Sequence, residues 1–88
     1  MRMYSVIEIQ TWPDGTVHEI VVPGKGHDPA KTEEENWNDA HSEYHRILQY
    51  AAISANPKHG AVILENNCTE IASEYYEHGE EETEDEVT

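Results

Sequence analysis

The stretch at residues 32–56, TEEENWNDAHSEYHRILQYAAISAN, decides the fold of this chain because it predicts one long helix. Thr32 and Glu35 form a capping box, in which the threonine hydroxyl accepts a hydrogen bond from the Glu35 amide and the glutamate reaches back. Pro57 disfavours helical geometry at Asn56, so we expect the helix to end there. At about 100° per residue the apolar side chains share one face and should pack on a second layer. That face consists of Trp37, Ala40, His41, Tyr44, Ile47, Leu48, Ala51 and Ala55.

Strands are predicted on both sides of this helix along the chain. Residues 3–12 alternate with the period of a strand, and residues 17–22 are rich in β-branched side chains. Pro13-Asp14-Gly15 lies between them and has the composition of a tight turn, which predicts a hairpin. Residues 61–65 and 70–76 predict a second hairpin after the helix.

The order β-β-α-β-β predicts an α+β fold, in which a four-stranded, mostly antiparallel sheet carries the helix on one face. Residues 1–76 are expected to form this single domain, and residues 23–29, rich in proline and glycine, to be a loop in which Gly24-Lys25-Gly26 is a flexible connector. Residues 77–88 have only one apolar side chain and predict a disordered acidic tail. The pattern leaves open whether the hairpins join through their first or their last strands.

A single helix leaves the second face of the sheet uncovered, and a small domain can hide such a face by dimerising or by binding a partner. In the first strand, Met3, Ile7 and Ile9 share one side and Tyr4, Val6 and Trp12 the other. We expect the second group to lie on the uncovered face. The set expected there is Tyr4, Val6, Trp12, His18, Ile20, Val22 and some of Tyr75 and Tyr76. A homodimer through this face is therefore one open alternative.

The charge balance excludes several classes of function. The 88 residues include 19 acidic and 5 Lys or Arg side chains, for a formal net charge of −14. Direct binding to nucleic acid or to an anionic membrane needs clustered cations, which this chain lacks. Its one cysteine, Cys68, cannot form an intramolecular disulfide, and we therefore expect a protein of the reducing cytoplasm, with no membrane span.

The chain carries no pattern that predicts catalysis, a metal site or a cofactor. His41 and His45 are four residues apart, as two zinc ligands on a helix would be, but no third ligand is identifiable. Glu43 points away from both histidines, which argues against a metalloprotease motif. Cys68 has no neighbouring basic residue to activate its thiol. We expect a non-enzymatic protein.

Acidity is the feature that departs furthest from the norm. It has a simple interpretation, which is solubility. The alternative interpretation is mimicry, in which carboxylates on a rigid surface occupy a cationic groove built for nucleic acid. The carboxylates expected to bind such a partner lie on the exposed side of the helix and on the second hairpin. They are Glu33, Glu34, Glu35, Asp39, Glu43, Glu65, Glu70 and Glu74.

Three stretches, EYHRIL at residues 43–48, AAIS at 51–54 and HGAVIL at 59–64, resemble small uncharacterised proteins encoded in phages and prophages of Gram-positive bacteria. The resemblance implies a hairpin, helix, hairpin order and a role in the cytoplasm of a bacterial host, and supplies no catalytic residue. The lead hypothesis is an acidic phage protein that binds a basic surface of a host protein, such as a CRISPR effector or another defence nuclease. The alternative is a phage structural or assembly module that oligomerises through its uncovered sheet face.

Overall fold

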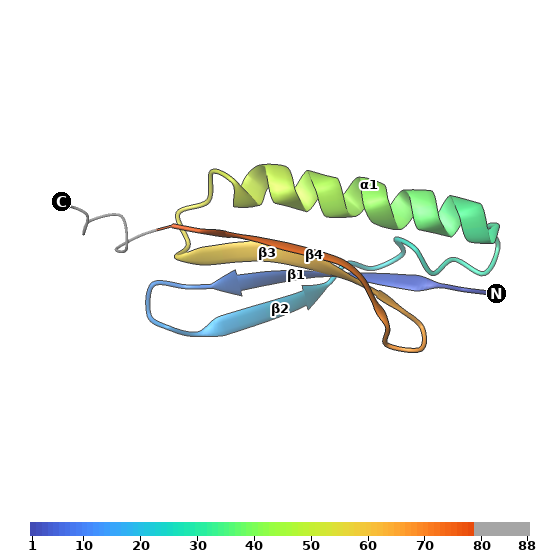
Figure 1. The fold of residues 1–88 in the computed structure, drawn as a ribbon, viewed down its shortest axis with the longest axis horizontal. Helices are drawn as coiled ribbons and strands as arrows, with labels where there is room; N and C mark the ends of the chain where they lie inside the picture. Colours follow the sequence, from blue (N-terminus) through green and yellow to red (C-terminus); the bar gives the residue numbers. More distant parts are fainter. Residues whose placement is uncertain (79–88) are drawn as a thin grey trace.

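The computed structural model describes residues 1–78 and has the predicted α+β architecture of four strands and one helix (Figure 1). The elements are β1 (Tyr4–Thr11), β2 (Val17–Val21), α1 (Glu33–Ala51), β3 (Lys58–Glu65) and β4 (Glu70–Glu77). The helix forms a second layer on one face of the sheet. The acidic tail predicted at 77–88 lies outside the described residues from position 79 onward.

All neighbouring strands are antiparallel, in the order β2-β1-β3-β4. The two hairpins therefore join through their first strands, β1 and β3, which pair from Tyr4 opposite Glu65 to Thr11 opposite Lys58. β4 extends to Glu77, which pairs with Lys58, so this residue belongs to the sheet and not to the tail to which the sequence had assigned it.

The helix begins as predicted and ends earlier than predicted. Thr32 Oγ1 accepts from the Glu35 amide at 3.0 Å, and the Thr32 amide donates to Glu35 Oε1 at 2.9 Å. α1 then ends at Ala51, five residues before Asn56, because the amides of Ile53 and Ser54 turn back to carbonyls three residues earlier. This tight turn delivers the chain to the start of β3, so Ala55 does not belong to the helix.

The hydrophobic core lies between α1 and the central strands. Its most buried large side chains are Val6, Ile47 and Ile63, each no more than 1% exposed. The rings of Tyr4 and Trp37 meet edge to face, with their centroids 5.3 Å apart. Figure 1 shows α1 running lengthwise along the sheet, and the helix contacts β1, β3 and β4.

The prediction for the uncovered face was wrong for most of its residues. Tyr4 and Val6 belong to the core beneath the helix, and Val22 and Tyr76 pack against it. Trp12, His18 and Ile20 also lie on the helix side: His18 and Ile20 pair with Gln10 and Glu8, and Trp12 is bonded to Gln10. Both sides of β1 are largely apolar, so its alternation could not reveal which side the helix covers. Of the expected set, only Tyr75 lies on the uncovered face, opposite Gly60.

The connector between β2 and α1 is held against the domain. The Tyr4 amide donates to the Gly26 carbonyl at 2.7 Å, and Gly26 is buried with φ +97°. The side chain of the fully buried Asn36 bonds to the Asp28 amide at 2.9 Å and to the Asp28 carbonyl at 3.0 Å. The loop predicted at residues 23–29 is therefore present, and its polar backbone groups at Gly26 and Asp28 are paired with β1 and α1.

Candidate functional site

The structure divides the eight predicted partner-binding carboxylates into two classes. Asp39, Glu43 and Glu65 are half-buried, and each forms a salt bridge with a basic side chain of the same molecule. The other five are exposed and form no salt bridge within residues 1–78. These five are Glu33, Glu34, Glu35, Glu70 and Glu74.

The paired carboxylates are engaged within the fold. Lys31 Nζ lies 2.7 Å from Asp39 Oδ2 and holds the pKa of this carboxyl below its usual value. Arg46 Nε donates to Glu43 Oε2 at 3.0 Å and lowers the pKa of Glu43 in the same way. Asp39 and Glu43 were predicted to lie on the exposed side of the helix, but both are only partly exposed, because Lys31 and Arg46 pair with them.

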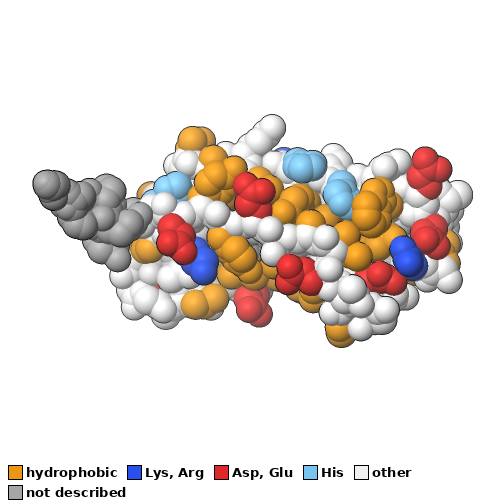
Figure 2. All heavy atoms as spheres, in the orientation of Figure 1, with side chains coloured by type: hydrophobic (Ala, Val, Ile, Leu, Met, Phe, Trp, Pro, Cys, Tyr) orange, Lys and Arg blue, Asp and Glu red, His pale blue; other side chains and the backbone are white. Residues whose placement is uncertain are grey.

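The exposed carboxylates form two groups. Glu33, Glu34 and Glu35 make up the first turn of α1, where the positive end of the helix dipole stabilises negative charge. Glu70 and Glu74 lie on β4, an edge strand of the sheet. The helix turn and the β3–β4 turn lie at the same end of the molecule (Figure 1), and Figure 2 shows acidic side chains along the face that α1 and β4 share.

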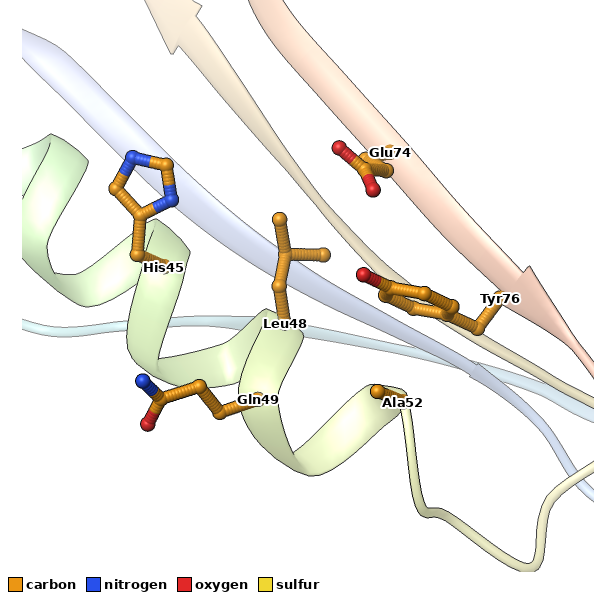
Figure 3. Close-up of a pocket in the computed structure, with 6 residues that line it drawn as sticks. All are labelled: His45, Leu48, Gln49, Ala52, Glu74 and Tyr76. Carbon is orange, nitrogen blue, oxygen red and sulfur yellow. The ribbon is translucent and has the colours of Figure 1, made fainter.

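A hollow of about 390 Å³ lies on this face between α1 and β4 (Figure 3). Glu74 and Tyr76 line it from the strand, opposite His45, Leu48 and Gln49 of the helix. Ala52, just after α1, completes the lining. A carboxylate and an aromatic ring on one wall match the chemistry that holds a Lys or Arg side chain, through an ion pair and a cation–π contact.

A buried polar pair that the sequence analysis missed lies elsewhere on the helix side of the sheet. His59 is only 5% exposed, and its Nε2 lies 2.6 Å from Glu8 Oε2. Gln10 Nε2 donates to the same carboxylate oxygen at 2.9 Å, and Trp12 Nε1 donates to Gln10 Oε1 at 2.8 Å. The pair links β1 to β3 through His59 Nε2, whereas His59 Nδ1 is buried without a hydrogen-bond partner among the described residues. Only the strand register could have revealed it, because Glu8 and His59 are 51 positions apart.

The described part of the chain holds no group of three or more His, Cys, Asp or Glu side chains arranged to bind a metal ion. His41 Nδ1 lies 3.0 Å from the Trp37 carbonyl, and its ring packs on the Trp37 ring with centroids 4.1 Å apart. Cys68 is exposed in the β3–β4 turn with φ +71°. Among residues 1–78, no helix is sufficiently long and apolar to cross a membrane.

Comparison with known proteins found no significant match to a protein family, to a curated sequence or to a solved structure. The features that bear on function are therefore the distribution of charge and of apolar surface over residues 1–78.

Proposed function

We propose that this protein is a non-enzymatic, acidic interaction protein that binds a basic surface of a host protein as a mimic of nucleic acid. The partner class that fits this chemistry is a nucleic-acid-binding defence enzyme of a bacterial host, such as a CRISPR effector nuclease, and the protein is then of phage or prophage origin. In this reading it acts in the host cytoplasm.

The observation that carries this proposal is the division of the carboxylates into paired and unpaired classes. Four of the five basic side chains, Arg2, Lys31, Arg46 and Lys58, form salt bridges with acidic side chains. Glu33, Glu34, Glu35, Glu70 and Glu74 remain exposed without such a bridge within residues 1–78. Unpaired carboxylates on a rigid scaffold attract a cationic groove through the same Coulomb field that phosphates use.

The hollow between α1 and β4 adds a specific contact to this long-range attraction. Glu74 and Tyr76 line it from β4, and together they offer a carboxylate and an aromatic ring to one basic side chain. Six further acidic side chains follow the described residues, at positions 80, 81, 82, 84, 85 and 86. The charge of the whole chain therefore increases the association rate, and the α1–β4 hollow contributes orientation.

A matched pair of variants tests this function. One triple variant, Glu34→Gln, Glu70→Gln and Glu74→Gln, removes unpaired carboxylates. The control triple variant, Asp39→Asn, Glu43→Gln and Glu65→Gln, changes the net charge equally but removes carboxylates already in salt bridges. The assay measures the displacement of fluorescent duplex DNA from each member of a panel of CRISPR effector nucleases.

The wild-type protein is expected to displace the DNA, with displacement that weakens as salt rises. The first triple variant should need about tenfold more protein, because three exposed contacts at about 0.5 kcal/mol each correspond to that factor. The control triple should stay close to the wild type. Equal losses in the two triples, or no displacement by the wild-type protein from any member of the panel, would refute the proposal.

A further inference from the structure

The face of the sheet opposite α1 is apolar and bears no covering layer within residues 1–78 (Figure 1). The strand register places seven apolar side chains on it. We call this surface the open face, and it consists of Ile7, Ile9, Val17, Val21, Val62, Leu64 and Tyr75. Val17, Val21 and Tyr75, on the edge strands, are 59%, 57% and 39% exposed, whereas Val62 on the central strand β3 is 8% exposed. Apolar side chains exposed along both edges of an uncovered face mark an interaction surface.

We propose that the open face is a homodimer interface, on which a second copy of this chain packs sheet against sheet. The size of the face, its distribution of charge and the arrangement of its side chains favour a second copy of the chain as the occupant. The proposal goes beyond the acidic binding function, because it uses a surface on the other side of the sheet from the α1–β4 hollow.

The open face has the size of a small stable interface. Three of its strands have eight residues and the fourth has five. At about 3.3 Å per residue and about 4.8 Å between strands, the sheet covers roughly 26 × 19 Å, or about 500 Å² in flat projection. Protruding side chains increase the accessible area toward the ~800 Å² that each partner buries in a standard interface.

Charge on this side of the sheet is confined to its rim. Glu19 lies on the edge strand β2, whereas Lys58 and Glu77 occupy the opposite corner with Nζ and Oε2 3.9 Å apart. Glu70 lies at the far end of β4, bonded to Ser73. An apolar centre with a polar rim is the usual composition of protein interfaces. A basic partner would find little to pair with at this centre, whereas an identical apolar face matches it.

Self-repulsion between two copies of so acidic a chain is limited by where the acids lie. The first turn of α1 and the α1–β4 hollow, with Glu33, Glu34, Glu35 and Glu74, belong to the helix side. Two facing sheets are about 10 Å apart, so the helix layers of a dimer lie well beyond the Debye length of about 8 Å at physiological salt. Screening therefore weakens the repulsion between these helix-side carboxylates.

The shape of the open face suits a twofold axis that runs along the strands. Such an axis keeps each residue at its level along the strands and places β2 of one copy over β4 of the other. Glu19, which shares the level of Tyr75 through Ile9 and Gly60, then lies opposite the Tyr75 ring, with Val17 and Val21 on either side. That ring lies across Gly60, where a Cβ atom would collide with the Tyr75 side chain. Lys58 Nζ lies 4.7 Å from the centroid of the same ring. Tyr75 is thus a pre-positioned aromatic anchor, the residue type that concentrates binding energy at interfaces.

The test uses the full-length protein alone and measures its mass by sedimentation velocity over about a hundredfold range of concentration. The wild type should shift from the 10.1 kDa chain toward twice this mass as concentration rises, and should keep dimerising in high salt, because the contact is apolar. Val21→Glu should weaken dimerisation at least tenfold. Ser42→Glu, on the exposed side of α1, adds the same charge and should leave it unchanged.

Tyr75→Ala provides a second measurement that adds no charge, and it should also shift the protein toward monomer. Circular dichroism verifies that each variant is folded. A wild-type protein that remains monomeric at every concentration would overturn the proposal, and so would a dimer that survives both Val21→Glu and Tyr75→Ala. Because no partner protein or DNA enters this experiment, its failure is distinct from failure of the proposed acidic function.

Discussion

Two glycines in the connector between β2 and α1 provide a sensitive test of how the fold is held together. Gly24 and Gly26 both have positive φ, +76° and +97°, but their surroundings differ. A Cβ at Gly24 would meet nothing within 4 Å, whereas a Cβ at Gly26 would lie 2.7 Å from the Tyr4 carbonyl oxygen and 3.0 Å from Ala40 Cβ. Substituting each by alanine therefore separates backbone strain from steric collision.

The magnitudes follow from these contacts. Alanine in a left-handed conformation costs about 1 kcal/mol, and the loss of unfolded-state freedom returns about half of that, so Gly24→Ala should cost below about 1 kcal/mol. Gly26→Ala carries the same strain and also pushes β1 from the connector. That displacement would break the 2.7 Å hydrogen bond from the Tyr4 amide to the Gly26 carbonyl. Leaving the buried Tyr4 amide without a partner costs about 1–3 kcal/mol. We expect Gly26→Ala to cost about 1.5–4 kcal/mol.

Urea unfolding followed by circular dichroism measures both free energies on one scale. The expected difference of about 2 kcal/mol corresponds to roughly 8–16 °C in melting temperature for a domain of this size. Similar losses for Gly24→Ala and Gly26→Ala would refute the reasoning, because they would mean that the connector can move away from Tyr4 and Ala40 at little cost.

Two further predictions concern the helix. In urea unfolding, Ile47→Ala should cost about 3–4 kcal/mol and Leu48→Ala about 2–3 kcal/mol. The reason is that Ile47 is 1% exposed, whereas Leu48 is 8% exposed and borders the α1–β4 hollow. A larger loss for Leu48→Ala than for Ile47→Ala would contradict this packing. Since Arg46 lowers the pKa of Glu43, their pair stabilises the fold above the usual carboxyl pKa of 4.5 and loses this effect as the pH falls through the lowered value. As the pH falls below about 4.5, the melting temperature of Glu43→Gln should therefore fall less than that of the wild type. Equal falls in the two melting temperatures would refute a stabilising role of the Arg46–Glu43 pair.

The elements of secondary structure could be predicted because their signals are local. The Thr32–Glu35 capping box is encoded within four residues, and both of its hydrogen bonds form. Asp14 accepts from the Thr16 amide at 3.0 Å, as the turn composition had indicated. The end of the helix was less predictable, because Pro57 sets only an upper limit and the turn into β3 ends α1 at Ala51.

The candidate site was only partly predictable, for a reason of distance along the chain. Glu33, Glu34 and Glu35 are exposed as expected, since they form the first turn of a helix. The salt bridge of Glu65 with Arg2 links residues that are far apart in the sequence, yet their N and O atoms are 3.3 Å apart. Composition counts both charges but contains no information on their separation, so it could not tell paired carboxylates from unpaired ones.

The sequence by itself determined the order β-β-α-β-β, the start of the helix and the excess of negative charge, because periodicity, capping and composition act over a few residues. Only the tertiary structure decided that Tyr4 and Val6 face the helix while Ile7 and Ile9 form the open face. A strand with apolar side chains on both sides can bury either one. The choice is made by the pairing of β1 with β3 and by the connector fixed at Gly26, contacts between residues distant in sequence.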